Sequence, residues 1–263
     1  MIDYDTALEL LEERLKIENK EKKEVRDTIL LYFGKVASLI FPCSIPAGVF
    51  QIDLHPKKGE INALLAEMRK AIYLILLSYS KKLLAIKQKF FEMELDVNID
   101  EMFTTGEDNI HDKCFIYSRR LSKEFESWFA MALLYKWSKD TLISNFKSNI
   151  QTPYNNQFFN TAIRKSTFSA TRLKYGGVSY GVGQYKSALN SLSRLSVIAI
   201  GAISKLADLS AMRNDGVSAI SVHRGSTYPC QLCDDKVGIH PLLDEFMPPF
   251  HANCKCFAVP LAL

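Results

Sequence analysis

The feature that most constrains the fold is a group of cysteines and a histidine near the C-terminus. Four of the six cysteines in this 263-residue chain fall within a stretch of 27 residues. The candidate ligands are spaced C-x2-C, seventeen residues, then H-x2-C-x-C, and are Cys230, Cys233, His251, Cys254 and Cys256. Two thiolates two residues apart on a tight turn can reach one ion, and the second group can complete a tetrahedron. Because soft thiolates and an imidazole favour zinc over calcium or magnesium, the spacing predicts a structural zinc site without an open coordination position.

Five candidate ligands compete for four positions at such a site. Cys254 and Cys256 are one residue apart, so in an extended strand they point the same way, and either both bind or one replaces His251. A disulfide pair and buried free thiols are the alternative interpretations. Metal binding is favoured because a cytosolic assembly site keeps thiols reduced. The other cysteines and histidines lack partners at ligand or catalytic spacing, and we interpret them as core or surface residues: Cys43, Cys114, His55, His111, His223 and His240.

Residues 1–150 show the periodicity of long helices. The pattern of Leu8, Leu11 and Leu15 predicts a helix from Asp5 to about Phe41, and dense apolar residues predict two more over 61–94 and 109–137. Three prolines and two glycines in 41–59 predict a loop or short strand between the first two helices. The last two are joined by a polar turn. We therefore expect a helical bundle over residues 1–150.

Composition excludes several classes of protein. With 48% hydrophobic residues and a net charge of +4, the chain as a whole is neither a strongly basic nucleic-acid module nor an acidic disordered tail. The N-terminus lacks the basic start and apolar stretch of a signal peptide. The apolar runs are shorter than the roughly 20 residues that span a bilayer, so we expect no membrane partner.

A basic, glycine- and aromatic-rich connector is predicted over residues 151–186. Between residues 150 and 213 eight basic residues face a single acidic one, a local charge of +7. Its GVGQYKS stretch has a tyrosine where a phosphate-binding loop needs a glycine before the lysine, so we interpret it as a flexible connection. A basic segment beside aromatics can contact DNA phosphates without sequence preference. The candidate DNA contacts are Arg164, Lys165, Arg172, Lys174 and Lys186.

The third predicted region, 187–263, is a small α+β module. An apolar helix over 187–212 leads to a strand near Val217–Val222, and 257–261 is predicted as a final strand. Pro248 and Pro249 predict an extended approach to the second ligand group. The expected fold class is therefore α+β, with a mainly helical N-terminal region and a small zinc-stabilised α+β C-terminal module.

The order of residues in this module resembles the C-terminal signature of the phage Mu F-like minor head proteins, also called head morphogenesis proteins. That signature combines an arginine segment, a cysteine pair followed by an aspartate and a glycine, and a Pro-Pro-x-His-x-Asn-Cys-x-Cys ending. The matching residues are Arg224, Cys230, Cys233, Asp235, Gly238, Pro248, Pro249, His251, Asn253, Cys254 and Cys256. Ala252 and Lys255 depart from the usual proline and arginine. The resemblance covers about the last 80 residues and says little about the first 150.

The resemblance implies a structural protein of a phage particle rather than an enzyme. It would associate with the portal protein and other capsid components at the head vertex, support procapsid assembly and DNA packaging or delivery, and reside in the host cytoplasm during assembly and then in the virion. Two other classes remain open from the residues alone. A metal-dependent nuclease or toxin domain would use the H-x2-C group, and a zinc-containing DNA-binding protein would use the basic segment.

Overall fold

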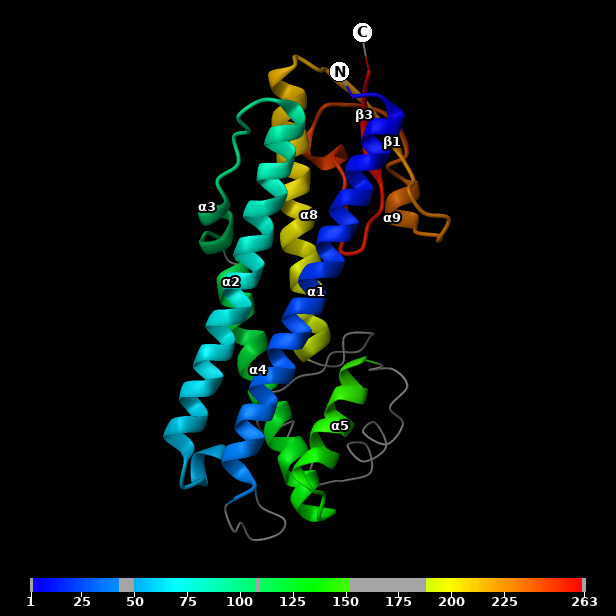
Figure 1. The fold of residues 1–263 in the computed structure, drawn as a ribbon. Helices are drawn as coiled ribbons and strands as arrows, with labels where there is room; N and C mark the ends of the chain where they lie inside the picture. Colours follow the sequence, from blue (N-terminus) through cyan, green and yellow to red (C-terminus); the bar gives the residue numbers. More distant parts are fainter. Residues whose placement is uncertain (1, 43–49, 107–108, 152–187, 262–263) are drawn as a thin grey trace. The chain divides into compact units, whose positions relative to one another are not determined.

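The computed structural model describes residues 2–42, 50–106, 109–151 and 188–261, and the fold is α+β and mainly helical, as predicted (Figure 1). The described chain forms two compact units, each built from segments far apart in the sequence. Residues 1–23, 74–110 and 194–263 form the first unit, and 24–73 and 111–193 form the second. The predicted boundaries at 150 and 187 flank a connector outside the described residues and stay predictions.

The long helices agree closely with the sequence pattern. The helices are α1 (Tyr4–Ile40), α2 (Lys58–Phe91), α3 (Ile99–Thr104), α4 (Ile110–Leu134), α5 (Lys139–Gln151), α8 (Ala188–Asn214) and α9 (Gln231–Asp234), with 3-10 turns η1 (Ile52–Leu54) and η2 (Asp244–Phe246). Within residues 1–150, the separate helix α5 was not predicted, and two short elements differ from expectation. The predicted polar turn contains α3, whose first turn is capped by the Asn98 side chain accepting from the Glu101 N–H. A loop or short strand was predicted over residues 41–59, and the described part of this range contains the 3-10 turn η1 and no strand.

Aromatic rings form the core of the second unit. Phe33 of α1 stacks on Phe146 of α5 with ring centroids 3.7 Å apart and meets Phe125 of α4 edge to face at 4.9 Å. Trp128 of α4 also meets Phe146 edge to face. Such pairs add to the hydrophobic stabilisation from burying large rings. They hold α4 and α5 on the second half of α1.

A three-stranded antiparallel sheet lies in the first unit. The strands are β1 (Ala219–His223), β2 (Gly238–Pro241) and β3 (Phe257–Leu261), in the order β2-β1-β3. One face of the sheet, with Ile220 and Val222, packs on Leu209 and Met212 of α8. On the other face, Phe257 packs on Leu11 and its neighbours at the start of α1. The C-terminal sheet therefore depends on the N-terminal helix for half of its cover.

The apolar helix predicted over 187–212 is observed as α8 (Ala188–Asn214). By length and composition, α8 is the one helix in the described residues apolar enough to cross a membrane, with a mean hydropathy of 1.6 over its most apolar 18 residues. However, 72% of that window is buried inside the fold. Lys87 of α2 donates to Asp208 of α8 from a fully buried position, and burial lowers the pKa of the lysine. The apolar residues of α8 are used in packing within the protein.

Candidate metal centre

The first ligand pair is presented by the single turn of α9. Cys230 precedes the turn with extended backbone, and its carbonyl accepts from the N–H groups of Cys233 and Asp234 at 3.0 and 2.9 Å. This geometry brings residues 230 and 233 to the same side of the turn. Cys233 is 3% exposed, whereas Cys230 is half-buried. The predicted tight turn is thus a short helical turn with its two thiols adjacent.

The second ligand group lies on the loop that leads into β3. The loop begins with a cis peptide bond between Pro248 and Pro249. Asn253 has a φ of 66°, a left-handed conformation that asparagine tolerates better than most residues. That turn lets the Cys254 N–H donate to the His251 carbonyl at 3.1 Å, and so folds the chain back on itself between two ligands. Asn253 therefore has a local structural role.

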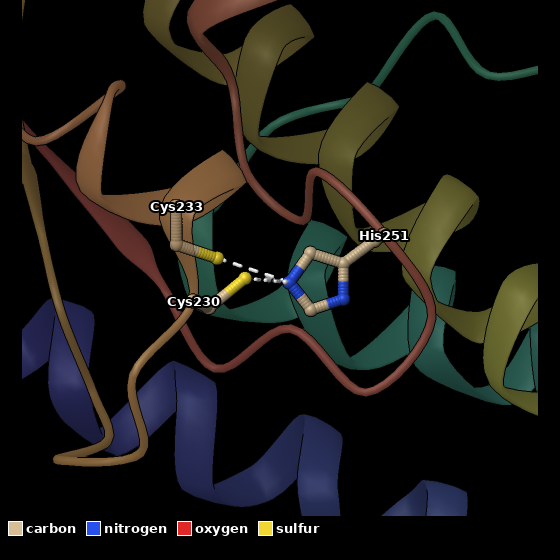
Figure 2. Close-up of side chains that lie close together, drawn as sticks. All are labelled: Cys230, Cys233 and His251. Carbon is tan, nitrogen blue, oxygen red and sulfur yellow. Dashed lines mark hydrogen bonds between the residues drawn. The ribbon is translucent and has the colours of Figure 1, made fainter.

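All five candidate ligands come together in the folded chain. They form two overlapping groups that share Cys233, one with Cys230 and His251 and the other with Cys254 and Cys256. Figure 2 shows the His251 ring directed at the first two sulfurs, with Nε2 3.3 Å from Cys230 Sγ and 3.0 Å from Cys233 Sγ. The Sγ atoms of Cys233 and Cys254 are 3.8 Å apart. Around a tetrahedral zinc ion, sulfurs are separated by about 3.8 Å, and a sulfur and a nitrogen by about 3.6 Å. The cluster could therefore hold a metal ion.

Hydrogen bonds prepare individual ligand atoms for this role. His251 Nδ1 donates to the Ala252 carbonyl at 2.7 Å, which leaves Nε2 with its lone pair facing the thiols. The Cys256 N–H lies 3.4 Å from Cys254 Sγ and donates to it. The Cys256 thiol also donates to that sulfur and is the main cause that lowers the pKa of Cys254 to about 5. The same hydrogen bond raises the pKa of Cys256.

A buried arginine of α1 holds the ligand loop from the other side. Arg14 donates to the Cys254 carbonyl, a contact between residues 240 positions apart. Its Nε lies 3.4 Å from a carboxylate oxygen of Glu18, one turn further along α1, and both side chains are almost fully buried. Burial raises the pKa of Glu18 despite the opposing charge of Arg14. Sequence analysis missed both residues, although their spacing after Leu11 puts charged groups on the predicted apolar face.

The segment between β1 and α9 is fixed by an arginine and a glycine. Arg224 donates to the Asp234 carboxylate and to the Tyr228 carbonyl, which ties the end of β1 to the turn carrying Cys233. A Cβ at Gly225 would lie 2.1 Å from the Lys255 carbonyl oxygen, so only glycine fits there. Arg224 was noted in the sequence pattern, whereas the close approach at Gly225 carried no recognisable signal.

Among the described residues, the other histidines and cysteines belong to neither ligand group. His223 stacks on Phe257, His240 stacks on Phe246, His55 is buried in the second unit, and His111 is exposed. Cys114 is buried, and Cys43 lies outside the described residues. The five candidate DNA contacts also lie outside them: Arg164, Lys165, Arg172, Lys174 and Lys186. The DNA contact stays a prediction.

Comparison with protein-family models, with curated proteins and with solved structures gave no match. The resemblance to the Mu F-like minor head proteins thus depends on the residue pattern alone.

Proposed function

We propose that this chain is a non-enzymatic minor head protein of a phage particle, whose C-terminal module is held together by a structural zinc ion. The observation that carries the proposal is the convergence of the five candidate ligands in two groups that share Cys233, with three of their interatomic distances between 3.0 and 3.8 Å. The proposed ligands are Cys230, Cys233, His251 and Cys254. Four protein ligands would fill the coordination sphere and leave no position for a reacting water, which favours a structural over a catalytic role.

The proposed ligand set leaves Cys256 as the supporting fifth residue. Its N–H donates to Cys254 Sγ and its thiol lies in hydrogen-bond contact with the same sulfur, and such contacts orient and stabilise a coordinating thiolate. Substituting Cys256 by serine should therefore preserve one zinc per chain, whereas substituting Cys254 should abolish it. Metal analysis of the two purified variants distinguishes the assignments, and zinc loss in Cys256→Ser alone would reverse them.

The zinc would stabilise a part of the chain that has little core of its own. Its ligands come from α9 and from the 248–256 loop, which are joined only by the short β2 and η2. A metal that binds both pieces contributes its binding free energy directly to folding. Through the Arg14 contact with Cys254, the bound loop would also hold the start of α1. The predicted role is a rigid C-terminal module attached to a helical body.

The assignment to phage head assembly is supported by the residue pattern and by the structural roles of two residues in that pattern. Asn253 makes the turn between two ligands, Arg224 holds the cysteine turn, and both are residues of that pattern. A portal-associated role is tested by co-expression with the portal protein of the same genome. We expect co-sedimentation with the portal ring, reduced in Cys233→Ser and retained in Cys114→Ser. Absence of any association with the portal would refute the proposal.

A nuclease assay separates the enzymatic alternative from this function. We expect the zinc-loaded protein to leave plasmid DNA and RNA intact in the presence of magnesium or manganese. Cleavage that disappears in His251→Ala or His240→Ala would assign the chain to the nuclease class instead.

A further inference from the structure

We propose that a groove between α2 and α4 in the second unit binds an acidic, amphipathic segment of a partner protein. The groove has a volume of about 340 Å³, and its walls come from η1, α2 and α4. It is separate from the metal centre, which belongs to the first unit. Neither the zinc site nor the predicted DNA contacts account for it.

The groove has the dimensions of a helix-binding site. On α2 its lining residues follow helical spacing from Asn62 to Arg69, and on α4 from Phe115 to Glu126. Eleven residues of α4 correspond to about 16 Å along the helix axis. A segment of about 12 residues in helical form spans that distance, and two parallel walls of this kind are how helix-in-groove partners are usually held.

Two arginines supply positive charge that the protein itself does not neutralise. The guanidinium of Arg69 lies over the Phe115 ring at 4.5 Å, which orients it and leaves its N–H edge able to donate. Arg119, one turn after Phe115 on α4, is exposed. Among the described residues no carboxylate lies within ion-pair distance of either arginine. A ligand carboxylate could accept two hydrogen bonds from either guanidinium.

The carboxylate at one end of the groove is already engaged. Glu126 accepts from the Ile52 N–H at 3.1 Å and lies 3.3 Å from the Lys123 ammonium. Lys123 and Glu126 therefore offset each other, and among the other charged residues of the groove the two arginines, Arg69 and Arg119, outnumber the single carboxylate of Asp53. The resulting field attracts an anionic ligand to the middle of the groove.

The apolar lining favours a peptide over a nucleic acid. Phe115 is 42% exposed, and the half-buried Leu65 adds apolar surface on the opposite side of the groove. A partner segment with leucine or phenylalanine beside aspartate or glutamate would satisfy both kinds of surface. A phosphate backbone would leave the apolar lining in water. The charge and the apolar surface together fit an acidic amphipathic segment.

A displayed library of random peptides of about 12 residues tests the inference. The full chain is the target, and the Arg69→Ala/Arg119→Ala double variant is used for counter-selection. We expect enriched peptides with acidic and large apolar residues, whose affinity falls about tenfold for each arginine removed and falls further with added salt. Arg120→Ala is the matched control, because Arg120 is the next residue on α4 but lies outside the groove and over Tyr117.

Three outcomes would overturn the inference. They are no enrichment over the double variant, equal weakening by Arg120→Ala, and a random-sequence duplex DNA that displaces the peptides and itself depends on Arg119. The helical content and melting temperature of each variant are measured first. If Arg69→Ala unfolds the protein, Arg69→Lys keeps the charge and should still weaken binding, because lysine lacks the planar pair of donors.

Discussion

Replacement of Arg14 by methionine should be among the most destabilising single changes in the first unit. The substitution preserves much of the side-chain volume but removes the hydrogen bond to the Cys254 carbonyl and the ion pair with Glu18. A hydrogen bond from a charged donor contributes about 1.5–3 kcal/mol. Glu18 is then left as an unpaired carboxylate on a nearly buried side chain.

The cost of the orphaned Glu18 has a ceiling that depends on pH. The carboxyl can take up a proton, and protonating a glutamate of pKa about 4.3 costs about 3.7 kcal/mol at pH 7 and about 2.3 kcal/mol at pH 6. Burial already raises the pKa of Glu18, and removal of Arg14 raises it further. A raised folded-state pKa gives stability that is present below the unfolded pKa and is lost as pH rises through the folded value. Because part of this cost is already present in the wild type, the total loss should be at most about 5–7 kcal/mol at pH 7 and should be smaller at pH 6.

Urea unfolding of the wild type, Arg14→Met, Glu18→Gln and the double variant at both pH values measures these quantities. The double variant should recover most of the Glu18 contribution and lose the extra pH dependence. Lys16→Met is the control, because its pair with Glu13 is exposed on the same helix and should change stability by less than about 1 kcal/mol. If Arg14→Met costs no more than Lys16→Met, or if its cost is the same at pH 6 and pH 7, the reasoning is wrong.

Three further outcomes follow from the structure. Cys233→Ser should remove the bound zinc and make the melting temperature insensitive to chelator, because the variant loses a large share of the roughly 10 kcal/mol that such a site contributes to folding. Cys114→Ser should keep both the zinc and the chelator sensitivity, and equal effects of the two substitutions would exclude the site. Gly225→Ala should destabilise by about 1–3 kcal/mol or more, because its methyl group would meet the Lys255 carbonyl at 2.1 Å, whereas Gly34→Ala in α1 has open space and should stabilise by about 0.5–1 kcal/mol; denaturant midpoints compare them. Burial raises the pKa of Cys114 to about 11, so its alkylation at pH 8 should be slow in the folded state and fast in urea, and mass spectrometry that found similar rates would contradict its burial.

Local sequence patterns predicted the long elements and the ligand cluster. The apolar periodicity located α1, α2, α4 and α8 because each is long enough to repeat its pattern many times. Prediction of β3 at 257–261 was also confirmed, since it is a continuous apolar run after the ligand loop. The spacing of the cysteines and of His251 was sufficient to predict that they would come together.

Features that depend on distant contacts could not be read in the same way. The strand β2 has four residues, begins with a glycine and exposes Ile239, so it carries no local strand signal and exists through pairing with β1. The partnership of Arg14 with Cys254 joins positions 240 residues apart, and nothing near either residue indicates it. Similarly, the groove of the second unit requires α2 and α4 to lie side by side before Arg69 and Arg119 can act together. In each case tertiary packing determines what the residue does.

The cover that α1 gives to the sheet has a consequence for folding during synthesis. Arg14 is synthesised 240 residues before its partner Cys254, and Leu11 is likewise made long before its partner Phe257. The start of α1 therefore lacks these partners until residues 254–257 have left the ribosome. Closing a loop of this length is entropically costly and slow relative to local helix formation. A chain that stops before Cys254 should therefore keep its helices but expose the start of α1 to chaperones and proteases.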